Sequence, residues 1–470
     1  MKFSNNKYIA LLSFLLLFVF SFLFSSCIKK RFAQTVSLEL QTKNDTSIDF
    51  VSQENSLLNY KESNPFIAIN NSIINVVLYD KFNPPVASRI FAYTNLTAHL
   101  VLSNFGLLKS PKLNIQISNN YSTTNYDTSF IYAVALTSQK IVAKNLVWSS
   151  LILENNFNEI INKWIINHDL QNKRVEIDSI SLLIANEIIL QSQKDGYVTR
   201  LANKRYEVLY DVENAWKPTA PSYQLPVEPH WKVVNTFYNL DRNKFYIQIP
   251  FEFSYDTSSS FYAINKELYF NTEKLSPTEK ITAKHWDCNP IQTKNVGHVK
   301  LFSFRHTPAA HWLLFISDIL LHSKISTEKS IELYSYLSTS MADAFTICWD
   351  LKYQNNFIRP ETYINKYIKK EWKPFIETPS FPEYPSGHSL ISTTASQICN
   401  HYLGDKFGFI DSTQRVFNLP DKYFSSFNQA ANDAGISRYY GGIHYLQSIE
   451  NGNIIGKYIG SYVVKNYINE

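Results

Sequence analysis

The stretch FPEYPSGHSL, residues 381–390, places a glycine and a histidine directly after a serine, in a chain with only 12 glycines in 470 residues. Proline disfavours helical dihedrals in the residue before it, so the approach to Ser386 is predicted to be extended. The residues that follow have the length and pattern of a helix, with Ser386 as N-cap and Gly387 and His388 in its first turn. A helix N-terminus favours an anion, because its N–H groups are unpaired and its dipole end is positive. A histidine at that position can move protons.

Two cations precede this stretch at helical spacing. Lys352 and Arg359 are seven residues apart, and on a helix that runs to Pro360 they share one stripe with Trp349. A solvated basic face has the same spacing, so the stripe alone does not identify a site.

Another cation and a second histidine follow near the C-terminus. Arg438 and His444 flank Gly441 and Gly442, where the backbone is expected to break or to approach another group closely. Glycines then recur every four residues at 452, 456 and 460, which predicts a strip of small residues for close packing against a neighbouring helix.

These segments together give the pattern Lys-x6-Arg-Pro, then Pro-Ser-Gly-His, then Ser-Arg-x5-His. The pattern resembles the superfamily of vanadium-dependent haloperoxidases and type 2 phosphatidic acid phosphatases. The segments WKPTAPSY, AKHWDCNP and TPAAHW look like exported bacterial members of the haloperoxidase branch, and the likeness runs from about residue 65 to the C-terminus. It implies an all-α fold of two helical bundles, with the active site within the C-terminal, four-helix-bundle-like half.

The resemblance also implies a role for each residue of the pattern. Five residues would cradle a tetrahedral oxyanion, vanadate or phosphate: Lys352, Arg359, Ser386, Gly387 and Arg438. His444 would bond to the central atom, as ligand to vanadium or as nucleophile to phosphorus. His388 would be the acid–base group. The sequence leaves open which carboxylate steadies Arg438, because Asp343 and Asp350 lie off the predicted stripe.

The cradle accepts vanadate and phosphate alike, because the two ions have the same shape and type of charge. With vanadate the substrates would be hydrogen peroxide, a halide and an organic acceptor. With a phosphate ester the protein would be a soluble acid phosphatase. Trp349 and Phe381 match aromatic positions beside vanadate in chloride-oxidising relatives and are candidates for a halide pocket, although both could be core residues. This match favours a haloperoxidase, and a tethered binding lipoprotein with an inactive site is the third alternative.

Helical patterns dominate from about residue 65 onward. We expect an N-terminal helical domain at 65–215, a Pro-rich connection at 216–231 that cannot be helical, and the catalytic domain at 232–470. Strand patterns are scarce, although RNKFYIQIPFEFSY, residues 242–255, could form a short hairpin.

The N-terminus has the layout of a secretory signal, with a basic start, an apolar stretch and two small residues before Cys27. We expect residues 1–26 to be a lipoprotein signal peptide, Cys27 to carry lipid, and 27–64 to be a polar tether. The body would then be exported and anchored to a bacterial membrane, facing the periplasm; an uncleaved membrane anchor is the alternative. Three cysteines remain, an odd number that excludes a disulfide framework as the support of the fold.

The net charge of +5 is too small to indicate a nucleic-acid partner, and no long basic run supports one. An apolar content of 45% with 18% charged residues is typical of an ordered globular protein. The composition does not define an oligomeric state.

Overall fold

The computed structural model describes residues 64–115, 126–296 and 298–469. Thirteen α-helices make up most of these ranges, together with two short antiparallel pairs of strands. The predicted all-helical fold is therefore confirmed. The signal peptide, Cys27 and the tether up to residue 63 lie outside the described residues, so lipid anchoring stays a prediction.

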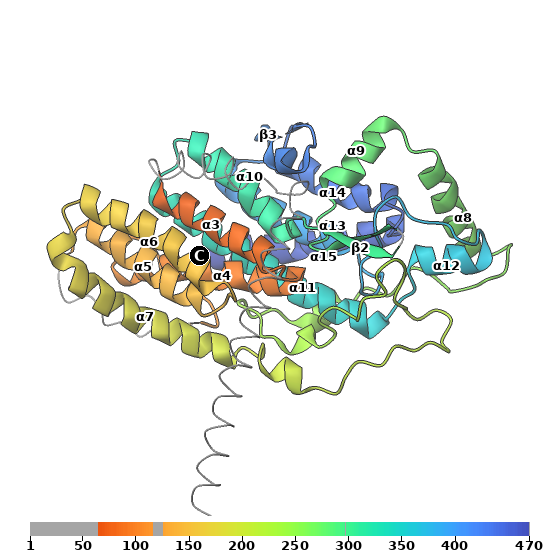
Figure 1. The fold of residues 1–470 in the computed structure, drawn as a ribbon, viewed down its shortest axis with the longest axis horizontal. Coiled ribbons are helices and arrows are strands. Elements are labelled where there is room, and N and C mark those ends of the chain that lie inside the picture. Colours follow the sequence, from red (N-terminus) through yellow and green to blue (C-terminus); the bar gives the residue numbers. More distant parts are fainter. Residues whose placement is uncertain (1–63, 116–125, 297, 470) are drawn as a thin grey trace, which may run out of the picture. The chain divides into compact units, whose positions relative to one another are not determined.

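Five helices follow one another in the N-terminal part of the described chain: α3 (Pro65–Tyr79), α4 (Pro84–Asn104), α5 (Thr128–Lys144), α6 (Ser150–Asn167) and α7 (Arg174–Lys194) (Figure 1). The first two begin with an asparagine N-cap directly before proline. The Asn64 side chain accepts the N–H of Phe66, and the Asn83 side chain accepts that of Val86. Proline fits at this position because a first-turn N–H has no partner within the helix.

Eight helices form the C-terminal part: α8 (Ser260–Glu273), α9 (Pro277–His285), α10 (Pro308–His322), α11 (Thr327–Asn355), α12 (Pro360–Tyr367), α13 (Gly387–Leu403), α14 (Phe427–Tyr440) and α15 (Leu446–Val463). The strand pairs are β1 (Gln292–Val296) with β2 (Val299–Ser303), and β3 (Phe409–Asp411) with β4 (Lys422–Phe424).

Helix α15 lies directly against α13 through its glycines. A Cβ at Gly456 would lie 2.3 Å from the carbonyl oxygen of Leu390, and one at Gly452 would lie 2.8 Å from that of Ser386. A Cβ at Gly460 would lie 2.6 Å from a side-chain carbon of α13. The predicted small-residue strip is confirmed, and it holds the N-terminal end of α13 in place.

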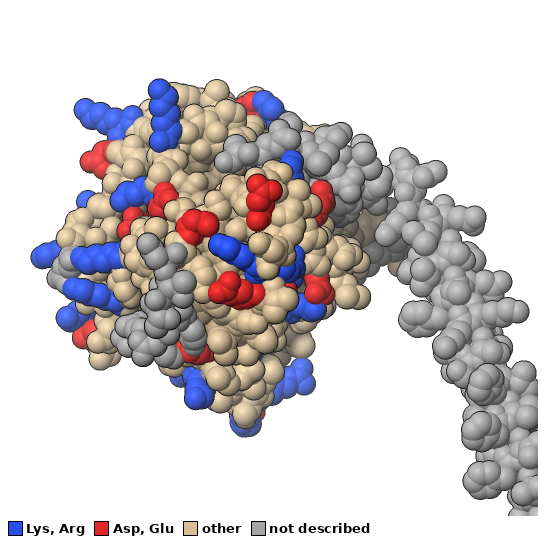
Figure 2. Space-filling view, turned by 90° about the vertical axis from the view of Figure 1, so that its left-hand side faces the viewer, with Lys and Arg blue, Asp and Glu red and all other residues tan. Residues whose placement is uncertain are grey.

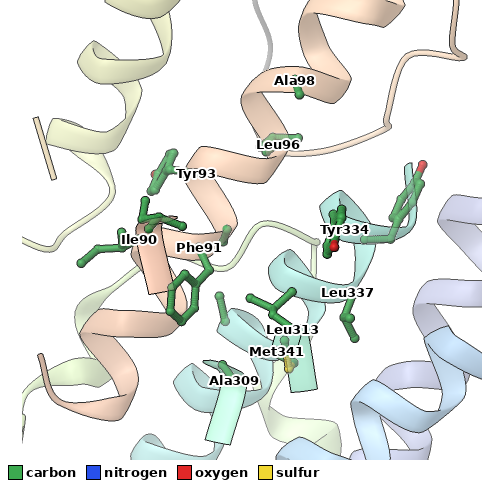
Figure 3. Close-up of a cluster of buried hydrophobic side chains, with 14 of the residues drawn as sticks. Ile90, Phe91, Tyr93, Leu96, Ala98, Ala309, Leu313, Tyr334, Leu337 and Met341 are labelled. Atoms are coloured by element: carbon green, nitrogen blue, oxygen red, sulfur yellow. The ribbon is translucent and has the colours of Figure 1, made fainter. Parts of the chain in front are cut away.

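The N-terminal and C-terminal helices share one hydrophobic core. Side chains of α4, α10 and α11 face one another in it, among them Ile90, Phe91, Leu313, Leu337 and Met341 (Figure 3). All five are buried. Because α4 packs along α11, this core supports the helix that carries Lys352 and Trp349.

The segment between α7 and α8 connects these two parts. Residues 216–230 contain no helix, and a short 3-10 helix, η3 (Trp231–Val233), begins at the last residue of the predicted connection. The predicted hairpin at 242–255 is wrong, since residues 246–255 run without strand pairing. Pro250 has no N–H to donate to a ladder, and the rings of Phe251 and Phe253 pack against Phe261 instead.

In the described ranges no helix is both long enough and apolar enough to cross a membrane.

At the end of the molecule occupied by α5, α6 and α7, on the left of Figure 1, basic and acidic side chains are interspersed (Figure 2).

Candidate active site

The helix that carries Lys352 ends earlier than the sequence pattern predicts. Helix α11 stops before Asn356, which adopts the left-handed conformation with φ 46° and ψ 39°. Arg359 has φ −80° and ψ 149°, the extended conformation that the following Pro360 favours. The prediction of one continuous stripe is therefore wrong, because Arg359 is the N-cap of α12. The two cations still meet at Phe381, with Nζ of Lys352 and Cζ of Arg359 each 5.1 Å from its ring centroid.

Ser386 is the N-cap of α13, and Gly387 and His388 open its first turn, as the sequence predicts. The Ser386 hydroxyl makes no capping bond and instead accepts a hydrogen bond from the Ser389 hydroxyl at 2.8 Å. The backbone N–H of Ser386 donates to the carbonyl of Ser448 on α15 at 3.1 Å. The first-turn N–H groups of α13 have no side-chain cap, which suits an anion-binding helix N-terminus.

A glycine turn separates Arg438 from His444. Helix α14 ends two residues after Arg438, and Gly442 has a positive φ of 77°. A Cβ at Gly441 would lie 2.6 Å from an isoleucine side chain, so both positions require glycine. The turn places Nε2 of His444 at 3.2 Å from Nη1 of Arg359.

A cavity of about 100 Å³ lies where these segments meet. It is lined by six of the predicted residues: Trp349, Phe381, Gly387, His388, Arg438 and His444. Lys352, Arg359 and Ser386 are fully buried beside it. The structure thus brings together all the predicted cradle, catalytic and halide-pocket residues. They come from six places in the chain: α11, the N-cap of α12, the segment before α13, α13 itself, α14 and the glycine turn.

Known proteins share this arrangement of helices. Residues 332–469 match a family model described as the second helical-bundle domain of VCPO. The crystal structure described as that of the first bacterial vanadium-dependent iodoperoxidase is 33% identical in sequence, with a TM-score of 0.76. The match covers 85% of this chain and 95% of that chain. The chain belongs to the vanadium-dependent haloperoxidase family.

Two more distant structures share the fold of this haloperoxidase. They are the holo and apo forms of a bacterial vanadium-dependent chloroperoxidase, each 13% identical, with TM-scores of 0.64 and 0.62. Each match covers 82% of this chain, and 92% and 94% of the respective relative. No curated protein sequence matches this haloperoxidase.

A carboxylate that sequence reasoning missed orients His444 in this haloperoxidase. Oε1 of Glu383 lies 2.7 Å from Nδ1 of His444 and accepts the N–H of Tyr445 at 3.2 Å, while Oε2 accepts the Ser448 hydroxyl at 2.8 Å. Burial raises the pKa of Glu383, and Arg359 and the neighbouring lysine oppose that shift. A guanidinium only donates, so Nε2 of His444 accepts from Nη1 of Arg359 at 3.2 Å, and Nδ1 carries the proton that is donated to Glu383. Nε2 is therefore the atom available to a ligand.

Glu383→Gln removes the negative charge from this pair while keeping its size. We expect vanadate affinity to fall roughly 10–100-fold, the usual effect of losing an outer-shell partner of a metal-binding histidine. Calorimetric titration with orthovanadate measures the change, and Glu252→Gln, at an exposed position, is the matched control. Equal affinity in the two variants would show that Glu383 does not orient His444.

Asp287 is the carboxylate whose charge acts on Arg438. Burial lowers the pKa of Arg438, and Asp287 opposes that shift. Both side chains line the cavity. Asp343 instead accepts two backbone N–H groups at 2.7 and 2.9 Å, and Asp350 lies 3.6 Å from Arg242. Asp287 is thus the carboxylate that counters the charge of Arg438 at the cavity.

Positive charge exceeds negative charge around the cavity of this haloperoxidase. Three buried cations, Lys352, Arg359 and Arg438, face two carboxylates, Glu383 and Asp287. Burial lowers the pKa of each cation, because the charged form loses hydration. An anion in the cavity would restore the charged forms.

The hydrogen-bond donors show where such an anion would bind. The Lys352 ammonium donates to three backbone carbonyls, of Pro382, Glu383 and Pro385, at 3.0, 2.9 and 2.5 Å. Its N–H groups are therefore already in use, and Lys352 contributes positive charge to the cavity rather than hydrogen bonds to an anion. In contrast, Nη2 of Arg359 and Nε2 of His388 are buried without a partner. Unpartnered buried polar atoms are costly. The Arg359 N–H fits an oxyanion directly, and Nε2 of His388 fits a protonated oxygen of that anion, or donates to it once the ring is protonated. The residues present therefore fit vanadate.

A second buried polar cluster consists of His285, His311 and Asp411, which is the one group of side chains in the described residues with the spacing to hold a metal ion. The Nε2 atoms of His285 and His311 lie 2.9 and 2.7 Å from the same oxygen, Oδ2 of Asp411. Since a carboxylate only accepts, both nitrogens carry protons and neither offers a lone pair to a metal. His311 therefore belongs to a hydrogen-bonded network and is not a metal ligand.

Proposed function

We propose that this protein oxidises a halide with hydrogen peroxide, using vanadate held by His444. The overall reaction is X⁻ + H₂O₂ + H⁺ → HOX + H₂O. The observation that carries the proposal is the unprotonated Nε2 of His444, which is oriented by Glu383 and accepts from the Arg359 guanidinium at 3.2 Å. The 33% identity with an iodoperoxidase structure supports it.

Vanadate, when bound, supplies a Lewis-acid centre that polarises peroxide toward attack by halide. The chain supplies the surroundings. Nε2 of His444 would hold the group, while Lys352, Arg359 and Arg438 would balance its charge. His388 lines the cavity with a free Nε2, and its ring hydrogen-bonds the backbone of Trp286. It is therefore placed to hold or release a proton at Nε2.

The apolar side of the cavity provides a place for the halide. The rings of Trp349 and Phe381 lie 4.8 Å apart at an angle of 50°, and both line the cavity. The Trp349 ring is fixed by a hydrogen bond from Nε1 to the Val227 carbonyl at 3.1 Å. A fixed aromatic wall suits a large, weakly hydrated anion. We propose iodide, the halide of the similar bacterial enzyme, as the substrate.

Purified protein with hydrogen peroxide, iodide and a reporter phenol tests the proposal. We expect iodination of the phenol only when orthovanadate is present as well, and bromide and chloride are run in parallel. Hydrolysis of an aryl phosphate that vanadate inhibits, without halogenation, would support the acid phosphatase instead. Absence of both activities would favour a binding protein with an inactive site.

We also propose that Cys27 carries a lipid that anchors the exported enzyme to a bacterial membrane. The support is the basic, then apolar leader that ends in two serines before this cysteine. Labelling of expressing bacteria with a palmitate analogue should mark the wild type but not Cys27→Ala. Equal labelling of both would contradict the proposal.

A further inference from the structure

Cys288 stands at the end of a buried Cys–His–Asp arrangement. Its Sγ lies 3.6 Å from Nδ1 of His311, and Nε2 of that ring lies 2.7 Å from Oδ2 of Asp411. Asp411 also accepts the backbone N–H and the hydroxyl of Thr413, at 2.9 and 2.6 Å. Cys288 is 4% exposed and the other two members of the arrangement are fully buried. The carboxylate thus holds an oriented imidazole beside a sulfur, as in sites that activate a cysteine.

The His311 imidazole is positively charged in this setting. Burial lowers its pKa, but the charge and hydrogen bond of Asp411, with a smaller effect of Cys288, raise it to about 10. Burial in turn raises the pKa of Asp411, but His311 and His285 hold it below its usual range. The charged ring thus lies against the Cys288 sulfur, with Nδ1 at 3.6 Å from Sγ.

Cys288 also faces the reaction space. It lines the same cavity as His388 and His444. Cys348 and Cys399, the other free cysteines among the described residues, are buried and do not line that cavity. Burial raises the pKa of both thiols. Cys288 is therefore the described cysteine that an oxidant released at His444 would meet.

We propose that Cys288 is a site of oxidation by the hypohalous acid that the enzyme releases, and that this oxidation limits the number of turnovers. The inference rests on the proposed function, because that reaction supplies the oxidant. A sulfenic acid would add a polar oxygen to the wall of a cavity of only about 100 Å³, next to His388. Access to the site would fall until a thiol reduces the sulfenic acid.

The oxidation balances without any further reagent. The Cys288 thiolate attacks the halogen of HOX, so an S–X bond forms, the O–X bond breaks and hydroxide leaves. Water then attacks the sulfur, halide leaves, and the released proton neutralises the hydroxide. The sum is RS⁻ + HOX → RSOH + X⁻, in which sulfur loses two electrons and the halogen gains them.

In the experiment, vanadate-loaded enzyme turns over peroxide and iodide, both reagents are removed by gel filtration, and dimedone is then added to trap sulfenic acids. Peptide mass spectrometry should find the adduct on Cys288 and not on Cys348 or Cys399, and only when vanadate is present. Cys288→Ala should complete several-fold more turnovers before half its initial rate is lost. In wild type without dimedone, dithiothreitol added after the reaction should restore activity.

His311→Gln tests the role of the imidazolium, because it keeps a polar side chain without the charge. We expect trapping at Cys288 to slow roughly 10-fold or more, because the sulfur loses its charged neighbour. If this variant does not fold, the rates at which iodoacetamide alkylates the cysteines of the wild type are measured instead. Faster alkylation of Cys288 than of Cys399 supports the proposal, and equal rates overturn it.

Two experimental results distinguish a failure of this inference from a failure of the proposed function. An enzyme that halogenates while Cys288 stays unmodified would overturn the inference and leave the function intact. Reagent hypobromous acid added to vanadate-free protein tests the sulfur even if no halogenation is found. Preferential modification of Cys288 would then support its assigned reactivity, and equal modification of all three cysteines would overturn it.

Discussion

His444→Ala should abolish halide oxidation. The variant loses Nε2 of His444, whose lone pair accepts from Arg359 on a ring that Glu383 orients, so the covalent anchor proposed for vanadate disappears. Lys352, Arg359 and Arg438 remain, and vanadate should still bind weakly through charge and hydrogen bonds. We expect the loss of affinity to exceed the roughly 10–100-fold that removal of an outer-shell partner causes.

Calorimetric titration with orthovanadate, together with the iodination rate, measures both effects. His298→Ala is the matched control, because His298 is an exposed histidine outside the cavity. If the His444→Ala variant and the control bind vanadate with equal affinity, His444 is excluded as the ligand.

His388→Ala should keep most of the vanadate affinity and lose turnover. The ring of His388 lines the cavity, but its free Nε2 is assigned to proton transfer rather than to the anchor. Loss of an acid–base group typically lowers the rate roughly 10²–10⁴-fold. The same titration and assay apply, and equal loss of vanadate binding in the two histidine variants would mean that their roles are assigned wrongly.

The pH dependence of turnover gives an independent check on His388. Burial, Arg438 and His311 all disfavour the imidazolium, so they hold the pKa of His388 well below its ordinary value. A bound oxyanion acts in the opposite direction, because negative charge favours the imidazolium and raises that pKa. The pH–rate profile of vanadate-loaded wild type should therefore contain a limb from His388 that is missing in His388→Ala. Identical profiles would contradict the assignment.

The sequence was most informative where one local rule determined the structure. Ser386 was recognisable as an N-cap because prolines precede it and a helical pattern follows. The glycine strip of α15 was recognisable from its spacing alone. The same rule disfavours a helical Arg359, because Pro360 follows it. The prediction from helical spacing, which extends α11 to Pro360, is therefore wrong at this position.

Residues that act through distant contacts carried no local signal. Glu383 lies three residues before Ser386, but in a loop without periodicity, so nothing indicated that its carboxylate meets His444, 61 residues later. Cys288, His311 and Asp411 come from three separate segments, and Asp411 is 100 residues from His311. Such pairs can be recognised only from the three-dimensional packing of the helices, because the two residues are far apart in the sequence.

The contact between α13 and α15 means that the active site depends on positions without functional groups. A methyl group at Gly452 would lie 2.8 Å from the Ser386 carbonyl, so the two helices would have to separate and Ser386 would move with α13. A variant that retains every lysine, arginine and histidine of the site would therefore still lose activity through a single alanine on α15. In this chain, the missing side chains at Gly452, Gly456 and Gly460 are therefore as necessary to the site as its charged residues.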